Sequence, residues 1–427
     1  MRARIGIVGG AVAGLWVGGL ASYSSSSSSS AGSSSSTRTL ACGSNSFGQL
    51  GTGDSLRRGG LSAVSSASPS IICLAAGKDS SALVTSDGLV YTFGRGNDGR
   101  LGHDGGESNV LAPRVVDNGL ASEGVRIRRV ALGEQHGAAI SEGGALYTWG
   151  SGARTANALG RPIAPDADGG RPARVESLSD ECVVDVALGR GYTVAVTSKG
   201  QVWAWGSGRG HALGLGSTKA QARPQRIALI EAPVVQVASG ESHTLALTKS
   251  GAVLAWGDDA RGQLGVGGGG GAERRFIRTP TPIGALAAGR LADDDVVVAV
   301  YAGAQHSAAL TKRGKIYTWG RGDSGQLGHG GIARDDRPTP TQVTCAALEG
   351  RSVRGVALGG AHSAAILDDG SCVVWGEGKA GQLGLGVDGK KSVAPRQTSP
   401  TPILNIAKGE TVALIACGGE HTLVVTK

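Results

Sequence analysis

The chain has 427 residues, of which 40% are hydrophobic. Its 74 glycines and 14 prolines, against three phenylalanines and one methionine, are typical of many short strands joined by tight turns and exclude a mainly helical core. The formal net charge is +8, but Arg2, Arg4 and Arg38 precede the first acidic residue, so the chain after residue 38 carries an excess of only five positive charges. No clustered Lys/Arg run marks this part of the sequence, and we expect no specific nucleic-acid binding.

Residues 1–38 differ in character from the rest of the chain. Residues 5–21 are uncharged and largely apolar, two arginines precede them, and serine tracts follow at 24–30 and 33–36. The arginines, the serines and the lack of acidic residues are typical of a mitochondrial presequence. The apolar stretch is also at the lower length limit of a membrane span, and its small-residue end fits a secretory signal. We predict mitochondrial targeting by a transit peptide, alone or combined with an inner-membrane anchor, with the secretory pathway, or the nucleus and cytosol, as alternatives.

One pattern recurs seven times after the serine tracts: a strand-like apolar run ends in glycine, and a Leu-Gly pair follows a few residues later. Clear copies are WGDDARGQLG from Trp256, WGRGDSGQLG from Trp319 and WGEGKAGQLG from Trp375. The anchor glycines are Gly43, Gly94, Gly150, Gly206, Gly257, Gly320 and Gly376, at intervals of 51, 56, 56, 51, 63 and 56 residues. A repeat of this length predicts an array in which each unit packs on its neighbours.

The run before each anchor glycine predicts a strand with one buried face. Tyr317 and Trp319 alternate as period-two residues do. Large side chains recur at the same spacing in five other units, and the first copy is reduced to Leu40 and Cys42. We interpret these rings as packing wedges between units rather than as ligand platforms. We further expect Gly320 to make a turn that a side chain would block, and Leu327 to pack the following loop onto the core.

Five of the eight histidines occupy one repeat position, three residues after a glycine and at the start of an alternating strand. They are His136, His243, His306, His362 and His421, and Ser80 and Tyr192 hold this position in the other two units. Because alternation places each histidine on the same face as apolar residues, we expect it to lie in a packed layer and make a local hydrogen bond rather than bind a metal. His103, His211 and His329 fall in turns, where we expect solvent exposure.

Between these two elements each of six units carries a proline shortly before a β-branched residue. The segments are APRVV at Ala112, RPARV at Arg171, RPQRI at Arg223, TPTPI at Thr279, TPTQV at Thr339 and SPTPI at Ser399. Proline tolerates only an edge or the start of a strand, so this segment predicts the outermost strand of each unit. Each repeat then supplies about four short strands, which is the content of one propeller blade.

The six cysteines are scattered and show no CxxC pair. They are Cys42, Cys73, Cys182, Cys345, Cys372 and Cys417, and most lie in or beside apolar runs. We interpret them as small buried hydrophobes, with disulfides or a metal as minor alternatives. We predict no cofactor and no metal.

Trp-Gly followed by Gly-Gln-Leu-Gly, and then by Gly-x-x-His-Ser/Thr, resembles the repeats of the regulator of chromosome condensation family. The resemblance covers residues 39–427 and implies an all-β fold, a seven-bladed propeller of four-stranded blades. We expect this propeller to be monomeric and to follow the leader and linker of residues 1–38. The repeats begin at the strand 39–42 and end with HTLVVTK at Lys427, just before the next aromatic strand. We therefore expect one blade to combine strands from both termini and to close the ring.

The fifth interval is the longest and departs most from the repeat. It contains VGGGGGAERRFIRTP and GRLADDDVVV. Loops on a rigid scaffold are common places for partner contacts, so we predict partner binding through residues of this interval. The candidates are Arg274, Arg275, Phe276, Arg278, Asp293, Asp294 and Asp295.

Two functions of different class follow from these observations. In the first, the protein is a non-enzymatic interaction scaffold that binds partner proteins through blade loops, tethered to or near a membrane through residues 5–21. In the second, which the family resemblance implies, it is a guanine-nucleotide exchange factor for a small GTPase. An ordinary hydrolase is not expected, because no nucleophile and base stand apart from the repeat pattern.

Overall fold

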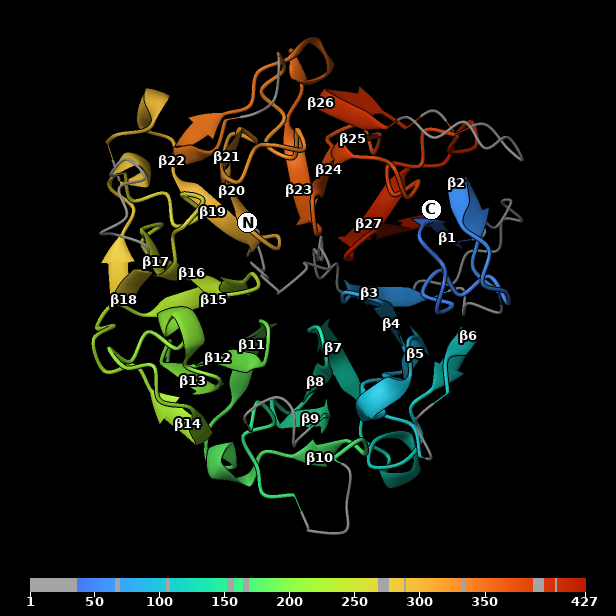
Figure 1. Ribbon diagram of the computed structural model, residues 1–427, viewed down its shortest axis with the longest axis vertical. Helices are drawn as coiled ribbons and strands as arrows, with labels where there is room; N and C mark the ends of the chain where they lie inside the picture. Colours follow the sequence, from blue (N-terminus) through green and yellow to red (C-terminus); the bar gives the residue numbers. More distant parts are fainter. Residues whose placement is uncertain are drawn as a thin grey trace, which may run out of the picture.

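The chain folds into seven four-stranded antiparallel sheets arranged around one central axis (Figure 1). This computed structural model describes residues 37–65, 70–104, 108–151, 157–163, 169–267, 276–287, 289–331, 335–386, 395–403 and 405–427. The predicted leader thus lies almost wholly outside the described residues. Among the residues that are described, no helix is long and apolar enough to cross a bilayer.

The strands of each sheet run outward from the axis in chain order, which confirms the seven-bladed propeller. The innermost strands are β3 (Ile71–Ala76), β7 (Ile127–Leu132), β11 (Val183–Leu188), β15 (Val234–Ser239), β19 (Val297–Ala302), β23 (Val353–Leu358) and β27 (Val412–Cys417). The second strands are β4 (Ser80–Thr85), β8 (His136–Ser141), β12 (Tyr192–Thr197), β16 (His243–Thr248), β20 (His306–Thr311), β24 (His362–Leu367) and β28 (His421–Thr426). We number the blades 1 to 7 in this order.

The outer half of each blade holds the aromatic strand and the proline-bearing segment. The third strands are β5 (Val90–Gly94), β9 (Leu146–Gly150), β13 (Val202–Gly206), β17 (Val253–Asp258), β21 (Ile316–Gly320), β25 (Cys372–Glu377) and β1 (Arg38–Gly43). The outermost strands are β6 (Val110–Val115), β10 (Ala173–Arg174), β14 (Gln221–Arg226), β18 (Phe276–Pro282), β22 (Arg337–Gln342), β26 (Arg396–Pro402) and β2 (Arg58–Ala63). The prolines therefore lie at the rim, as predicted from their inability to donate a ladder hydrogen bond.

The two ends of the chain meet in blade 7 and close the ring. Its strand order is β2-β1-β28-β27, so the N-terminal half of the chain supplies the outer pair of strands and the C-terminal half supplies the inner pair. Leu40 lies opposite Val424, and the guanidinium of Arg38 forms an ion pair of 3.0 Å with Glu410. This closure completes blade 7 as a four-stranded sheet like the other six, in agreement with the expectation.

In blades 1 to 6 the aromatic ring of the third strand packs against the turn of the preceding blade, and Cys42 holds this position in blade 7. The indole Nε1 of Trp319 donates a hydrogen bond of 2.9 Å to the carbonyl of Gln263, and Leu264 beside it is fully buried. Gly320, at φ +97°, passes so close to the neighbouring turn that a Cβ would lie 2.8 Å from the carbonyl oxygen of Gln305. The rings are packing wedges between blades, as interpreted, and Leu327 is buried as expected.

The five repeated histidines join neighbouring blades. Each Nε2 lies 2.9–3.0 Å from the hydroxyl of a serine or threonine in the next blade: Thr193, Ser307, Ser363, Thr422 and Ser81 in chain order of the histidines. Because each of these hydroxyls also donates to a backbone carbonyl, it accepts from a neutral imidazole. Burial lowers the pKa of these histidines to about 3 or about 4. Their predicted packed environment and hydrogen bonds are confirmed.

The expected exposure of the other histidines is wrong for His103. Its side chain is buried, and its Nε2 lies 3.0 Å from the hydroxyl of Thr92. His329 is half-buried and makes the same contact with Thr318. The hydroxyls of Thr92 and Thr318 also bond the carbonyl two residues before the histidine, so the loop folds the ring inward onto the strand.

The interpretation of the cysteines as buried hydrophobes holds for half of them. Cys42, Cys372 and Cys417 are buried in the core between blades 6 and 7, and burial raises the pKa of the Cys42 thiol to about 12. Cys73 and Cys345 are half-buried, and Cys182 is exposed. All six thiols are free. Cys182 precedes the innermost strand β11, so it lies in a connection between blades rather than within the core.

Candidate functional site

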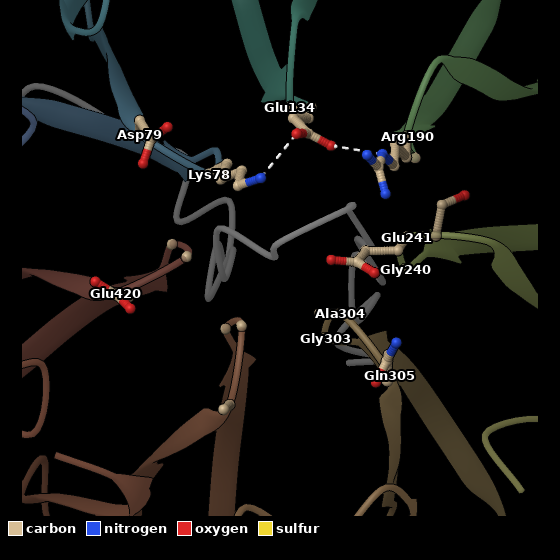
Figure 2. Close-up of a pocket in the computed structure, with 18 of the residues that line it drawn as sticks. Lys78, Asp79, Glu134, Arg190, Gly240, Glu241, Gly303, Ala304, Gln305 and Glu420 are labelled. Atoms are coloured by element: carbon tan, nitrogen blue, oxygen red, sulfur yellow. Dashed lines mark hydrogen bonds and ion pairs between the residues drawn. The ribbon is translucent and has the colours of Figure 1, made fainter. Parts of the chain in front are cut away.

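The strongest departure from seven-fold symmetry lies where the central axis opens on one face of the propeller. Seven turns join each innermost strand to the second strand, and we call them the mouth turns: 77–79, 133–135, 189–191, 240–242, 303–305, 359–361 and 418–420. Since successive strands are antiparallel, the loops between third and outermost strands emerge on the same face, which we call the mouth face. A cavity of about 470 Å³ lies within the ring of mouth turns (Figure 2).

The mouth turns share a backbone but not their side chains. Blades 1 to 4 project Lys78, Glu134, Arg190 and Glu241 at the first position after the turn glycine. Blades 5 to 7 carry Ala304, Gly360 and Gly419 at the same position. We call the first set the charged arc and the second the glycine arc. The same turn therefore carries a long charged side chain in four blades and no side chain larger than a methyl group in the other three.

Main-chain hydrogen bonds link consecutive mouth turns around most of the ring. The amide of Arg190 donates to the carbonyl of Glu241, that of Glu241 to Ala304, and that of Ala304 to Gly359, at 3.0–3.1 Å. The amides of Gly360 and Gly419 continue the chain to the carbonyls of Gly418 and Gly77. These links connect the turns of blades 3 to 7 and return to blade 1.

Ion pairs connect the turns of blades 1, 2 and 3, between which the described residues form no such main-chain bonds. The ammonium of Lys78 lies 2.8 Å from Oε1 of Glu134, and Nε of Arg190 lies 3.2 Å from Oε2 (Figure 2). One carboxylate thus joins the turns of blades 1, 2 and 3. Lys78 and Arg190 are mostly exposed, so solvent weakens both ion pairs.

The glycine arc is explained by the close approach of adjacent turns. A Cβ on Gly360 would lie 2.4 Å from the carbonyl oxygen of Gly419, and a Cβ on Gly419 would lie 2.6 Å from that of Lys78. Both distances are below any ordinary contact, so these turns pack together only without side chains. At this position three of the seven mouth turns therefore carry no long side chain, while Gln305 and Glu420 follow at the next position.

Glu241 differs from the other charged residues of the arc because it forms no ion pair with any residue that the structure describes. Its side chain is half-buried and points into the cavity (Figure 2). Burial raises the pKa of this carboxyl above its ordinary value, Arg190 opposes the shift, and Glu134 adds to it. Arg190 is itself engaged by Glu134, and Arg321, which also lines the cavity, pairs with Asp323 at 2.8 Å.

The structure separates the partner-binding residues predicted in the fifth interval. Arg274 and Arg275 lie outside the described residues, as does the side chain of Asp293. Phe276 and Arg278 begin the outermost strand β18 on the mouth face, where both are exposed and the ring of Phe276 lies 6.0 Å from that of His211 in blade 3. Asp294 and Asp295 lie in the connection to β19, on the opposite face. They do not form one patch with Phe276.

Asp295 has a local structural role. It is buried, and its Oδ1 accepts the amides of Val296 at 2.9 Å and Arg313 at 3.2 Å. Asp294 is exposed, with a positive φ of 53° in a short 3₁₀ turn. No described group of three or more His, Cys, Asp or Glu side chains is arranged to hold a metal ion.

Sequence reasoning missed the mouth residues. Their only signal is that they occupy the two variable positions between the turn glycine and the repeated histidine, where Lys-Asp, Glu-Gln, Arg-Gly, Glu-Ser, Ala-Gln, Gly-Ala and Gly-Glu follow one another. Nothing in the sequence places these pairs around one cavity until the ring closes.

Comparisons with known proteins agree with this architecture. The family model described as RCC1-like domain matches residues 38–424. The human E3 ubiquitin-protein ligase HERC2 is 36% identical over 80% of this chain, which spans only 6% of HERC2's length. The mitochondrial RCC1 domain-containing protein RUG3 of Arabidopsis thaliana is 34% identical over 70% of this chain and 65% of its own. The crystal structure of Prp20p from Saccharomyces cerevisiae superposes with a TM-score of 0.76 at 24% identity, covering 92% of both chains.

Proposed function

Because the chain belongs to the RCC1-like domain family, we propose that it is a non-enzymatic interaction propeller that binds a partner protein through its mouth face. The observation that carries this proposal is the division of the mouth into a charged arc and a glycine arc. The turn accepts lysine, glutamate and arginine side chains in the charged arc, so the identity of these side chains is free to serve recognition.

The composition of the mouth face supports a protein partner. Charged groups around the cavity lie on the same face as three exposed apolar side chains, Leu56, Leu111 and Phe276, which sit in or beside loops that lead into outermost strands. The side chain of Arg95 stacks on Phe47, at 4.9 Å from the ring, and pairs with Asp79 of the first mouth turn at 3.3 Å. Aromatic and arginine side chains beside a polar cavity are typical of protein interfaces.

Blocking the cavity tests the proposal. Ala304 lies on the glycine arc and already carries a Cβ, so Ala304→Trp fills the cavity without new backbone strain. The tagged full-length chain and this variant are expressed in the source cells, and co-purifying proteins are quantified by mass spectrometry. We expect partners to be lost with Ala304→Trp and kept with Ala346→Trp, an exposed alanine in the connection between β22 and β23 on the opposite face. Equal recovery with both variants would overturn the assignment.

Guanine-nucleotide exchange is the second candidate. Prp20p, which shares the fold, is described as binding Gsp1p and histones. The measurement is the release of a fluorescent GDP analogue from a panel of small GTPases, with the wild-type chain and with Ala304→Trp. Faster release of the GDP analogue with the wild-type chain, and no such effect with Ala304→Trp, would establish nucleotide exchange at the mouth. Exchange would then replace the non-enzymatic function.

We propose a mitochondrial location for the protein. The support is the arginine- and serine-rich leader and the likeness to a relative named as mitochondrial. Residues 1–38 fused to a fluorescent protein should direct it to mitochondria, and alkaline extraction of the full chain would tell a membrane tether through residues 5–21 from a soluble matrix form. Secretory, nuclear or cytosolic fluorescence would contradict the proposal.

We also propose that the start of β18 and the segment before it extend the interface at the rim of the mouth face, through Arg274, Arg275, Phe276 and Arg278. Arg278→Glu should then weaken partner recovery in the same purification. The acidic residues Asp293, Asp294 and Asp295 would belong to a separate contact on the opposite face, which Asp294→Lys tests. If neither substitution changes the recovery of partner proteins, these proposed contacts would be contradicted.

A further inference from the structure

We infer that the mouth cavity accepts one basic side chain, a lysine or arginine of the partner protein, and that Glu241 is its counter-charge. This inference rests on the proposed function and specifies the chemistry of the partner. It follows from the ion-pair balance of the cavity wall and from the open approach over the glycine arc.

The charge of the cavity lining favours a basic partner group. Five lining side chains are negative and three are positive: Asp79, Glu134, Glu241, Glu377 and Glu420 against Lys78, Arg190 and Arg321. The three positive groups already contact carboxylates, since Lys78 and Arg190 share that of Glu134 and Arg321 pairs with Asp323. An acidic partner group would therefore meet a lining with a negative excess, whereas a basic group would reduce that excess.

Glu241 and Glu420 are the lining carboxylates that form no ion pair with any described residue, whereas Asp79 pairs with Arg95 and Glu377 with Lys379. Glu241 is the more buried of the two. A carboxylate taken out of water without a cation in contact is destabilised, and a cation that reaches it recovers that free energy. Glu241 is thus the anchor, and exposed Glu420 adds negative potential from blade 7.

The glycine arc provides the path to Glu241. The next mouth turn after Glu241 carries Ala304, and the two turns beyond it carry Gly360 and Gly419. A partner segment can approach over these turns, which carry no long side chain at this position, and one long side chain can extend from there to Glu241. Lysine and arginine have the length and the charge for this geometry.

Selection from a random peptide library displayed on phage tests the inference with the full-length chain. Selected peptides are synthesised with a fluorescent label, and their affinities are measured by anisotropy for wild type, Glu241→Gln, Ala304→Trp and Glu231→Gln. Glu231 is an exposed glutamate at the opposite end of β15, on the other face, and is the matched control. Thermal denaturation of each variant confirms that it is folded.

We expect the peptides displaced by Ala304→Trp to share a lysine or arginine. Glu241→Gln should weaken them about tenfold or more, as loss of a half-buried charge partner does, with Glu231→Gln unchanged. Peptides that require an open cavity but lack a basic residue, or that bind Glu241→Gln as well as wild type, would overturn the inference and leave the proposed function standing. Failure to select any peptide sensitive to Ala304→Trp would count against both.

Discussion

The imidazole Nε2 of His243 lies 2.9 Å from the hydroxyl oxygen of Ser307 in the next blade. That hydroxyl donates to the carbonyl of Gln263, which also accepts the indole of Trp319. Three side chains from three separate repeat motifs thus converge on the boundary between blades 4 and 5. The repeated residues therefore join neighbouring blades.

His243→Ala should destabilise the propeller by about 2–4 kcal/mol, because it removes a buried hydrogen bond and leaves a cavity. The measurement is the midpoint of urea unfolding. His211→Ala, at a half-exposed histidine outside the repeat position, is the control and should cost clearly less. Equal losses would contradict an architectural role for the repeated histidines.

Stability should fall as the pH drops from about 6.5 towards 4. The repeated histidines have a pKa of about 3 to about 4 in the folded chain, against an ordinary value of 6.5, so in this window the unfolded state binds more protons. Each such histidine contributes a slope of about 1.4 kcal/mol per pH unit. Asp185 and Asp259, whose pKa burial raises to about 6, oppose the trend, but the five histidines outnumber them. Urea unfolding at several pH values measures the slope, and His243→Gln should reduce it.

Asp185→Ala should cost about 3–5 kcal/mol, because it leaves the guanidinium of Arg129 buried without its carboxylate. Nη2 of Arg129 in β7 contacts Oδ1 of Asp185 in β11 at 2.6 Å, and Oδ2 accepts the amide of Val237 in β15 at 2.9 Å. The double variant Arg129→Leu/Asp185→Leu should lose less than Asp185→Ala alone. Urea unfolding measures the loss of stability for the double variant and for the single variants Arg129→Leu and Asp185→Leu. A loss in the double variant equal to the sum of the two single losses would show that the pair is not coupled.

Gly360→Ala should destabilise the ring between blades 6 and 7 by about 1–3 kcal/mol, since its Cβ would lie 2.4 Å from a carbonyl oxygen and the mouth turns would have to separate. Gly284→Ala is the matched control, because a Cβ there meets nothing within 4 Å. Thermal unfolding compares the two. A Gly360→Ala variant as stable as Gly284→Ala would show that the glycine arc is not required by packing.

Glu134→Gln should cost only about 1 kcal/mol or less, although it removes both ion pairs of the charged arc, because the basic partners are mostly exposed. The difference from wild type should shrink further in about 1 M salt, where the Debye length is about 3 Å. Urea unfolding at low and high salt measures both effects. A large, salt-independent loss would indicate that Glu134 also stabilises the turns in another way.

Much of the architecture could be predicted from the sequence because it repeats. Three patterns recur along the chain: the spacing of the anchor glycines, the alternation before Trp319 and the prolines at the rim. Because they recur in unit after unit, each is explained by the blade structure that the units share. Isolated residues were harder. Cys182 sits in a loop whose path depends on neighbouring contacts. His103 has a counterpart in His329, but the contacts of these rings with Thr92 and Thr318 depend on how the loop folds back onto the strand.

The sequence by itself determined the number of blades, their four strands and the shared blade that closes the ring, because short-range periodicity sets strands and a fixed repeat sets their stacking. Only the tertiary structure decided what the mouth is. Glu134, Glu241 and Gly360 belong to three different blades, and they line one cavity only because the blades close into a ring. The balance of ion pairs there, which leaves Glu241 without a partner among the described residues, depends on distances between blades that no local pattern records.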